Sequence, residues 1–188
     1  MKETTKKKLI SPLSFLINFL IYLKISPTLI TLSGLFFSIF TGYFYYKGNF
    51  LMAGIFLIFI ALADTIDGEL ARKGERVSKK GALLDSIIDR LTEFFIFLGL
   101  FLYYQKLPIT LLPFLAFATS FFVSYTRARA EGVGIECKIG IFERPIRMVL
   151  LIIGSFLLKR YFHYLLIILI IGNFSTFLQR LFYSFKRL

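Results

Sequence analysis

Long apolar runs alternate with short polar stretches along the whole chain. Crossing the roughly 30 Å of hydrocarbon in a bilayer takes about 20 helical residues, and six runs approach or exceed that length. They cover residues 27–46, 50–72, 82–104, 107–129, 145–158 and 161–180. The fifth run is short, so we expect it either to extend into its flanks or to tilt. The pattern predicts an all-α, polytopic membrane protein with six transmembrane helices.

A shorter apolar pattern precedes the first span. Its members recur at helical spacing and are Leu13, Phe15, Leu16, Phe19, Leu20 and Leu23. Behind the lysines at 6–8, this spacing favours an amphipathic helix lying on the membrane surface. Pro12 and Lys24 interrupt the run and no small-residue cleavage pattern follows, so we interpret it as retained rather than as a signal peptide. We therefore divide the chain into a cytoplasmic N-terminus with its surface helix, 1–26, and a six-helix domain, 27–188.

Charged residues gather at one set of helix ends. All 11 acidic residues and all but four of the 23 lysines and arginines fall there. The exceptions are Lys47, Lys106, Lys159 and Arg160. By the positive-inside rule the richer side is cytoplasmic, which places both termini and the polar chemistry on the cytoplasmic face of a cell membrane.

Composition narrows the class of protein further. With 57% hydrophobic residues in 188, the chain exceeds what a water-soluble domain of this size buries. The net charge is +12, but the basic residues are scattered between apolar segments and do not form a dense tract with interleaved aromatics. This distribution argues against nucleic acid as a partner. An anionic membrane surface or a phosphorylated substrate fits better. The single cysteine, Cys137, excludes an internal disulfide.

Four aspartates carry the strongest chemical signal. Asp64 and Asp67 are three residues apart, and Asp85 and Asp89 are four apart, so each pair lies along one face of its helix. Two helices can therefore present four carboxylates to one cleft. Crowded carboxylates in a low-dielectric setting need compensation, and divalent cations supply it. All-oxygen ligands favour Mg²⁺, Mn²⁺ or Ca²⁺ over zinc.

Small and basic residues accompany the aspartates. Gly68 and Gly81 offer surface without side chains, where a flat base or a diphosphate can approach the backbone. Ala71 follows one turn later on the same face as Gly68, and Arg72 adds a planar donor fork suited to phosphate oxygens. These features together predict a nucleotide-diphosphate site with metal.

The pattern D-x2-D-G-x2-A-R-x8-G-x3-D-x3-D, from Asp64 to Asp89, resembles the signature of the CDP-alcohol phosphatidyltransferases at every fixed position. The six spans and the surface helix are also similar to the family fold, so the resemblance extends over essentially the whole chain. It implies transfer of a phosphatidyl or archaetidyl group from a CDP-activated lipid to a small alcohol, with release of CMP. It also implies Mg²⁺ or Mn²⁺, as a pair of ions, and a homodimer.

The resemblance assigns roles by position. Asp89 resembles the catalytic base. The positions similar to metal ligands are Asp64, Asp67, Asp85 and Asp89. The positions similar to CDP-lipid contacts are Asp67, Gly68, Ala71, Arg72, Gly81 and Asp85. A carboxylate at the edge of a metal site can take the proton from an attacking hydroxyl, which agrees with the role of Asp89.

A second group of residues bears on the acceptor. Ser124, Arg127, Arg147 and Arg180 lie near the cytoplasmic ends of three different predicted spans. Guanidinium groups that converge from several helices suit an acceptor carrying its own phosphate. The segments S-Y-T-R-A-R-A-E, E-R-P-I-R and Q-R-L resemble the phosphatidylinositol-phosphate and archaetidylinositol-phosphate synthase branch, which implies that these four residues bind the phosphate of inositol 1-phosphate. Bacterial members often have lysine where this chain has Arg127. Arg129 and Arg144 are interpreted as helix-end or loop charges near the nucleotide.

Other functions remain open at this stage. Glycerol 3-phosphate, serine or free inositol are alternative acceptors for the same chemistry. An ion or proton transporter is an alternative of a different class, because intramembrane acids often form relays. That class predicts carboxylates spread along a path near the midplane, or two repeated halves, and the chain has neither. A non-catalytic scaffold leaves the aspartate spacing unexplained.

Overall fold

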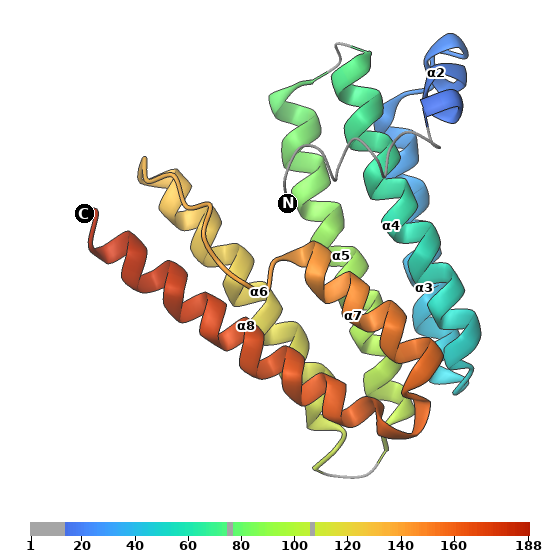
Figure 1. Ribbon diagram of the computed structural model, residues 1–188, viewed down its shortest axis with the longest axis vertical. Coiled ribbons are helices and arrows are strands. Elements are labelled where there is room, and N and C mark those ends of the chain that lie inside the picture. The colour runs from blue at the N-terminus through green and yellow to red at the C-terminus, as the bar shows by residue number, and fades with distance from the viewer. Residues whose placement is uncertain (1–13, 75–76, 106–107) are drawn as a thin grey trace.

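The computed structural model describes residues 14–74, 77–105 and 108–188, and every regular element in those ranges is helical (Figure 1). The elements are α2 (Ser14–Tyr22), α3 (Pro27–Tyr46), α4 (Phe50–Lys73), α5 (Lys79–Tyr103), α6 (Leu111–Gly132), α7 (Arg144–Leu157), the 3-10 turn η2 (Lys159–Tyr161) and α8 (Phe162–Phe185). The all-α class is therefore confirmed. Predictions for residues 1–13 and for the start of the fourth span at residue 107 lie outside the described ranges.

A helix occupies each of the six predicted runs, but the helices differ in character. Within the described ranges, four segments are long and apolar enough to cross a membrane: Pro27–Tyr46, Phe50–Lys73, Leu111–Gly132 and Lys159–Phe185. Helix α5 has 25 residues, but its first half carries several charged side chains. Helix α7 has 14 residues, which at 1.5 Å per residue is about 21 Å, shorter than the apolar layer of a bilayer.

Local sequence sets the ends of the two helices that carry the aspartates. The Asn49 side chain accepts a hydrogen bond from the Met52 amide at 3.1 Å and so caps the start of α4. Ser78 does the same for α5 by accepting from the Gly81 amide at 3.0 Å. Such caps satisfy amide groups that have no partner within the helix. They fix where α4 and α5 begin.

The helices form two groups, which are joined by α7 and by the packing of α5 against α6. Helix α3 packs along both α4 and α5, while α6 packs along α8. In Figure 1 the α6–α8 pair leans away from α4 and α5 in the upper part of the view, and α7 lies between the two groups. Aromatic side chains fill the interior near the α3–α4 and α7–α8 turns, where Tyr45, Phe50 and Phe162 are almost fully buried. This packing holds the far ends together and leaves the aspartate-bearing ends more open.

Two glycines let α3 and α5 cross with their backbones in contact. A Cβ placed on Gly99 would lie 2.1 Å from the carbonyl oxygen of Gly42, and one on Gly42 would lie 2.4 Å from the carbonyl oxygen of Phe95. Backbone atoms cannot move aside as a flexible side chain can, so any larger residue pushes the helices apart. Small residues at such crossings are the usual basis of close packing between membrane helices.

We expect Gly99→Ala to lower the thermal unfolding midpoint of detergent-extracted protein, because overpacking of this kind costs about 1–3 kcal/mol. Gly132→Ala is the matched control, since nothing lies within 4 Å of a Cβ built at that helical position. Its midpoint should equal or exceed that of the wild type, because alanine has the higher helix propensity. Equal midpoints for the two variants would contradict the close crossing.

Candidate active site

The two aspartates of α4 lie in different environments. Asp67 is buried and accepts a hydrogen bond from the Thr31 hydroxyl at 2.7 Å, which ties α4 to α3 at this point. Asp64 is partly exposed and forms an ion pair with Arg144 from the start of α7. A buried carboxylate with one hydroxyl partner keeps free lone pairs, so Asp67 retains capacity for another ligand.

The two aspartates of α5 face the same region from the other side. Asp85 is exposed, whereas Asp89 is largely shielded and its Oδ1 atom lies 2.7 Å from Nη1 of Arg144. That Oδ1 atom has no hydrogen-bond partner, so the contact is an ion pair only. Asp64 and Asp85 each repel both Asp67 and Asp89 electrostatically, so all four carboxylates belong to one negatively charged region.

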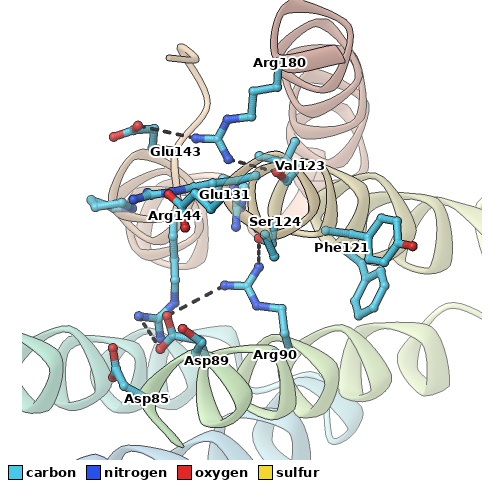
Figure 2. A pocket seen from close by; sticks show the side chains of 16 residues that line it. Asp85, Asp89, Arg90, Phe121, Val123, Ser124, Glu131, Glu143, Arg144 and Arg180 are labelled. Carbon is cyan, nitrogen blue, oxygen red and sulfur yellow. Dashed lines mark hydrogen bonds and ion pairs between the residues drawn. The ribbon is translucent and has the colours of Figure 1, made fainter. Parts of the chain in front are cut away.

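Arg144 compensates this negative region. Its guanidinium group pairs with Asp64 on α4 and with Asp89 on α5, so one cation bridges the two aspartate-bearing helices. Figure 2 shows the Arg144 side chain reaching from α7 toward Asp89. The sequence interpretation of Arg144 as a loop or helix-end charge near the nucleotide missed this contact. Arg144 thus offsets part of the negative charge of the four aspartates.

The carboxylates of the four aspartates are suitable ligands for a divalent cation, but they do not converge on a single point. Among the described residues, no three histidine, cysteine or acidic side chains converge tightly enough to hold a metal ion as they stand. The carboxylates are nonetheless hard oxygen donors of the kind that Mg²⁺ and Mn²⁺ prefer, and Asp89 Oδ1 is buried without a hydrogen bond. The arrangement therefore suits a cation that shares the carboxylates with Arg144 or displaces its guanidinium.

The small residues of the motif lie beside the aspartates. The Arg72 guanidinium lies over Gly68, about 3.5 Å from where a Cβ would be, and it pairs with Glu69 at 2.5 Å. Ala71 is half-buried on the same helix. Gly81 sits in the first turn of α5 with its amide bound to Ser78. A bulky side chain at 68 would push on the arginine, so glycine keeps that guanidinium close to the helix.

A cavity of about 610 Å³ opens beside Asp89. Its walls come from α5, α6, α7 and α8, together with Glu143 just before α7. The lining includes Asp85, Asp89, Arg90, Ser124, Arg127, Arg144, Arg147 and Arg180 (Figure 2). Six of the residues singled out from the sequence thus border one space: two aspartates and all four residues of the acceptor group. Asp64, Asp67, Gly68, Ala71, Arg72 and Gly81 do not line it.

The three predicted arginines differ in how firmly they are held. Arg127 is half-exposed and pairs with Glu131 at 2.8 Å on its own helix. Arg180 is buried and donates to the carbonyl oxygens of Ile139, at 2.7 Å, and Val123, at 2.9 Å. Arg180 is therefore held in place by backbone carbonyl groups. Arg127 has fewer contacts and is freer to bind a ligand.

Arg147 is also buried. It donates to the Phe142 carbonyl oxygen at 2.9 Å and to Glu93 at 2.6 Å. The Ser124 hydroxyl on α6 accepts a hydrogen bond from Arg90 on α5, so the Arg90 guanidinium group orients this hydroxyl. The cavity therefore combines a carboxylate, a hydroxyl and several guanidinium groups, as binding a phosphorylated alcohol requires.

Sequence reasoning missed Glu93 and Arg90 as parts of this site. Glu93 is 2% exposed and contacts Arg147, Arg90 and Ser120. A signal was present, because residues 85, 89 and 93 recur at intervals of four and so continue the acidic face of α5 by one turn.

The chain belongs to the CDP-alcohol phosphatidyltransferases, because the model of that family matches residues 24–178. It is thus a membrane-associated enzyme of phospholipid synthesis that uses a CDP-alcohol. Its relatives include a protein of Aquifex aeolicus, 41% identical over 176 residues that make up 92% of this chain and 89% of the relative. They also include the archaetidylinositol phosphate synthase of Pyrococcus horikoshii, 37% identical over 190 residues that cover 100% of this chain and 98% of that one.

Solved structures share the fold. The phosphatidylinositol phosphate synthase of Mycobacterium tuberculosis with CDP-DAG bound superimposes with a TM-score of 0.81 at 24% identity, over 90% of this chain and 91% of the other. The same enzyme in complex with manganese and citrate gives a TM-score of 0.82 at 24% identity, over 90% and 87%. The two proteins therefore share one helical fold over about nine tenths of this chain.

Proposed function

We propose that this enzyme transfers a phosphatidyl or archaetidyl group from a CDP-activated lipid to the hydroxyl of inositol 1-phosphate, releasing CMP. The single observation that carries the acceptor is the cavity in which Asp85 and Asp89 share walls with Ser124, Arg127, Arg147 and Arg180. A neutral alcohol or a zwitterion has little use for three guanidinium groups, whereas a phosphate dianion gains from each. Relatives named archaetidylinositol phosphate synthase and phosphatidylinositol phosphate synthase support the same acceptor.

The donor binds on the motif face in this proposal. The CDP part would contact Asp67, Gly68, Ala71, Arg72, Gly81 and Asp85, next to the cavity. The exposed Arg72 fork suits the diphosphate, and it lies over Gly68, where no side chain keeps it away from the helix. The Mycobacterium tuberculosis structure with CDP-DAG bound supports a lipid donor of this kind.

Asp64, Asp67, Asp85 and Asp89 would hold divalent cations, and we propose a pair of Mg²⁺ or Mn²⁺ ions. A bound cation supplies neutralisation of the carboxylates and of the diphosphate. The manganese complex of the Mycobacterium tuberculosis enzyme supports a metal in this fold. Arg144 performs part of that neutralisation within the protein, because it already pairs with Asp64 and Asp89.

Asp89 acts as the general base in this mechanism. The acceptor's hydroxyl oxygen attacks the phosphorus that carries the lipid, and its proton passes to Asp89. The bond from that phosphorus to the phosphate oxygen of CMP breaks, and CMP leaves. Asp89 borders the cavity, and its carboxylate is an acidic group of the motif that lies next to the arginines there, so it is placed to accept that proton. The arginines of the opposite walls hold the acceptor's phosphate so that the hydroxyl points toward α5.

We further propose a membrane arrangement in which α5 and α7 complete a set of six transmembrane helices. Glu93 on α5 and Arg147 on α7 are buried and pair with each other, so these two charges are shielded from lipid. Both termini and the active site would then face the cytoplasm, with residues 1–26 at the membrane surface and residues 27–188 as the catalytic domain. A homodimer in a cell membrane is the expected assembly.

The test is CMP release by purified enzyme given CDP-lipid, Mn²⁺ and one acceptor at a time: inositol 1-phosphate, glycerol 3-phosphate, serine or free inositol. We expect inositol 1-phosphate to give the highest kcat/KM, with CDP-diacylglycerol and CDP-archaeol compared as donors. If no acceptor led to CMP release, the proposed transferase activity would be contradicted. A preference for serine or free inositol would contradict the proposal that the arginines bind a phosphorylated acceptor.

The same assay includes a matched pair of arginine variants on α6. Arg127→Ala removes a side chain that lines the cavity, and we expect it to raise the KM for inositol 1-phosphate roughly tenfold. Arg129→Ala removes an exposed arginine on the same helix that does not line the cavity, and its KM should stay at the wild-type value. Equal KM values would remove Arg127 from the acceptor site.

A further inference from the structure

Glu93 is a buried charge that pairs with Arg90 and Arg147, two residues that line the cavity, and the proposed reaction does not use it directly. It lies one helical turn beyond Asp89 on α5, so its side chain projects from the same face. Only 2% of the residue is exposed. A carboxylate taken out of water at this depth requires paired charges and hydrogen bonds, so the identity of its partners matters.

The two oxygens of Glu93 have different partners. Oε1 accepts from Nη2 of Arg147 at 2.6 Å. Oε2 accepts from the Ser120 hydroxyl at 2.5 Å and lies 3.4 Å from Nη1 of Arg90. One carboxylate therefore joins three helices: α5 through itself and Arg90, α6 through Ser120, and α7 through Arg147.

On the α7 side, Glu93 fixes the orientation of the Arg147 guanidinium group. One terminal nitrogen of Arg147 is used by Glu93 and the other by the Phe142 carbonyl oxygen. The remaining Nε is buried without a hydrogen-bond partner, although the residue lines the cavity. An unsatisfied buried donor is costly unless something binds it, so an anion that reaches this side of Arg147 would gain a hydrogen bond.

On the α5 side, Glu93 holds Arg90 between two residues of the proposed reaction. Nη1 of Arg90 donates to the Ser124 hydroxyl, and Nη2 lies 3.8 Å from Oδ2 of Asp89. Figure 2 shows Arg90 reaching from α5 toward Ser124 across the cavity. Arg90 thus spans the space between the proposed phosphate ligand and the proposed base, and its orientation sets the distance between them.

The charge balance of the group favours a positioning role over a purely structural one. Two guanidinium groups share one carboxylate, which leaves one positive charge beside the cavity. A buried ion pair contributes little net stability compared with apolar residues of the same volume, so stability alone does not account for it. Oriented donors with a remaining positive charge are what an anionic ligand needs for a fixed position.

We propose that Glu93 is the positioning residue of the acceptor site. It orients Arg147 with one oxygen and Arg90 with the other, so that the acceptor's phosphate is held at a set distance from Asp89. This inference rests on the proposed function, because it takes a phosphorylated acceptor as given. Glu93 itself touches no substrate and acts only through the two arginines.

The test uses Glu93→Gln and separates binding of the phosphate from its placement. The neutral amide leaves the cavity more positive, so phosphate binding should persist while its orientation is lost. We expect kcat with inositol 1-phosphate to fall at least tenfold. The KM for CDP-lipid should stay unchanged, and the inhibition constant of inorganic phosphate should stay unchanged or decrease.

Two further variants keep the test decisive if Glu93→Gln folds poorly. Ser120→Ala removes one partner of Glu93 and leaves both arginines, so it should lower kcat in the same direction but less. Ser155→Ala removes a buried hydrogen bond to Tyr45 on the far side of the molecule, and it should lower thermal stability without changing kcat per folded molecule.

The outcomes distinguish the two proposals. A wild-type enzyme that does not use inositol 1-phosphate would overturn the proposed function. A wild-type enzyme that uses it, with Glu93→Gln and Ser120→Ala behaving like Ser155→Ala, would overturn only the positioning role. A parallel rise in the KM for CDP-lipid would also overturn it, because the effect would then not be confined to the acceptor.

Discussion

Asp89→Asn should reduce CMP release by a factor of about 10² to 10⁴, the range that general-base catalysis contributes. The amide nearly matches the carboxylate in shape, so the fold should persist. It has no basic oxygen to take the hydroxyl proton, and its weaker negative end binds a cation poorly. The measurement is the single-turnover rate with saturating inositol 1-phosphate, because that rate isolates the chemical step from product release.

Glu136→Gln is the control for this experiment. Glu136 is an exposed carboxylate in the loop after α6 and pairs with Lys138, away from the cavity. Its neutralisation should leave the rate unchanged. A single-turnover rate for Asp89→Asn within threefold of the wild type would show that another group accepts the proton.

Removal of divalent metal should abolish CMP release and also lower the stability of the protein. Four carboxylates in one region repel each other, and Arg144 neutralises only part of their charge. A cation that binds only the folded state stabilises it by about 2.7 kcal/mol at a concentration one hundred times its Kd. Adding Mn²⁺ or Mg²⁺ to chelator-treated enzyme should therefore raise the thermal unfolding midpoint as well as restore activity.

The variant that tests the metal ligands is Asp64→Asn. It removes one of the proposed ligands and one partner of Arg144, so the rise in midpoint with Mn²⁺ should shrink or disappear. Glu136→Gln should retain the full rise. An undiminished rise in Asp64→Asn would exclude that carboxylate from the metal site, whatever the effect on activity.

Sequence patterns predicted the helices well because apolar runs and polar interruptions are local properties. The start of α4 follows from the Asn49 cap, and the start of α7 from the E-R-P run, in which Pro145 is favoured in a first helical turn. The pattern shows that the fifth span is short, and α7 indeed has only 14 residues and does not extend into its flanks. The pattern does not reveal how the polar side chains of α5 and α7 are buried, nor which faces of these helices meet lipid. Those properties depend on which neighbours shield the helix.

The candidate site was predictable to the extent that its residues share a spacing. The aspartates could be paired by helical periodicity, and the arginines could be grouped because helix ends meet at one membrane face. The pairing of Arg144 with Asp64 could not be foreseen, because 80 residues separate the partners and only tertiary packing brings them together. The partner of Arg147 was equally hidden, since Glu93 is on another helix and continues a face that the family motif does not include.

One turn of α7 carries both Arg144, which neutralises the aspartates, and Arg147, which borders the acceptor cavity. Three residues apart on a rigid helix, these two guanidinium groups cannot be repositioned separately. A shift of this helix would disturb the donor half and the acceptor half of the reaction together. Changes of acceptor preference between related enzymes should therefore arise in α6 and α8. Side chains on these helices can change without moving Arg144 relative to the aspartates.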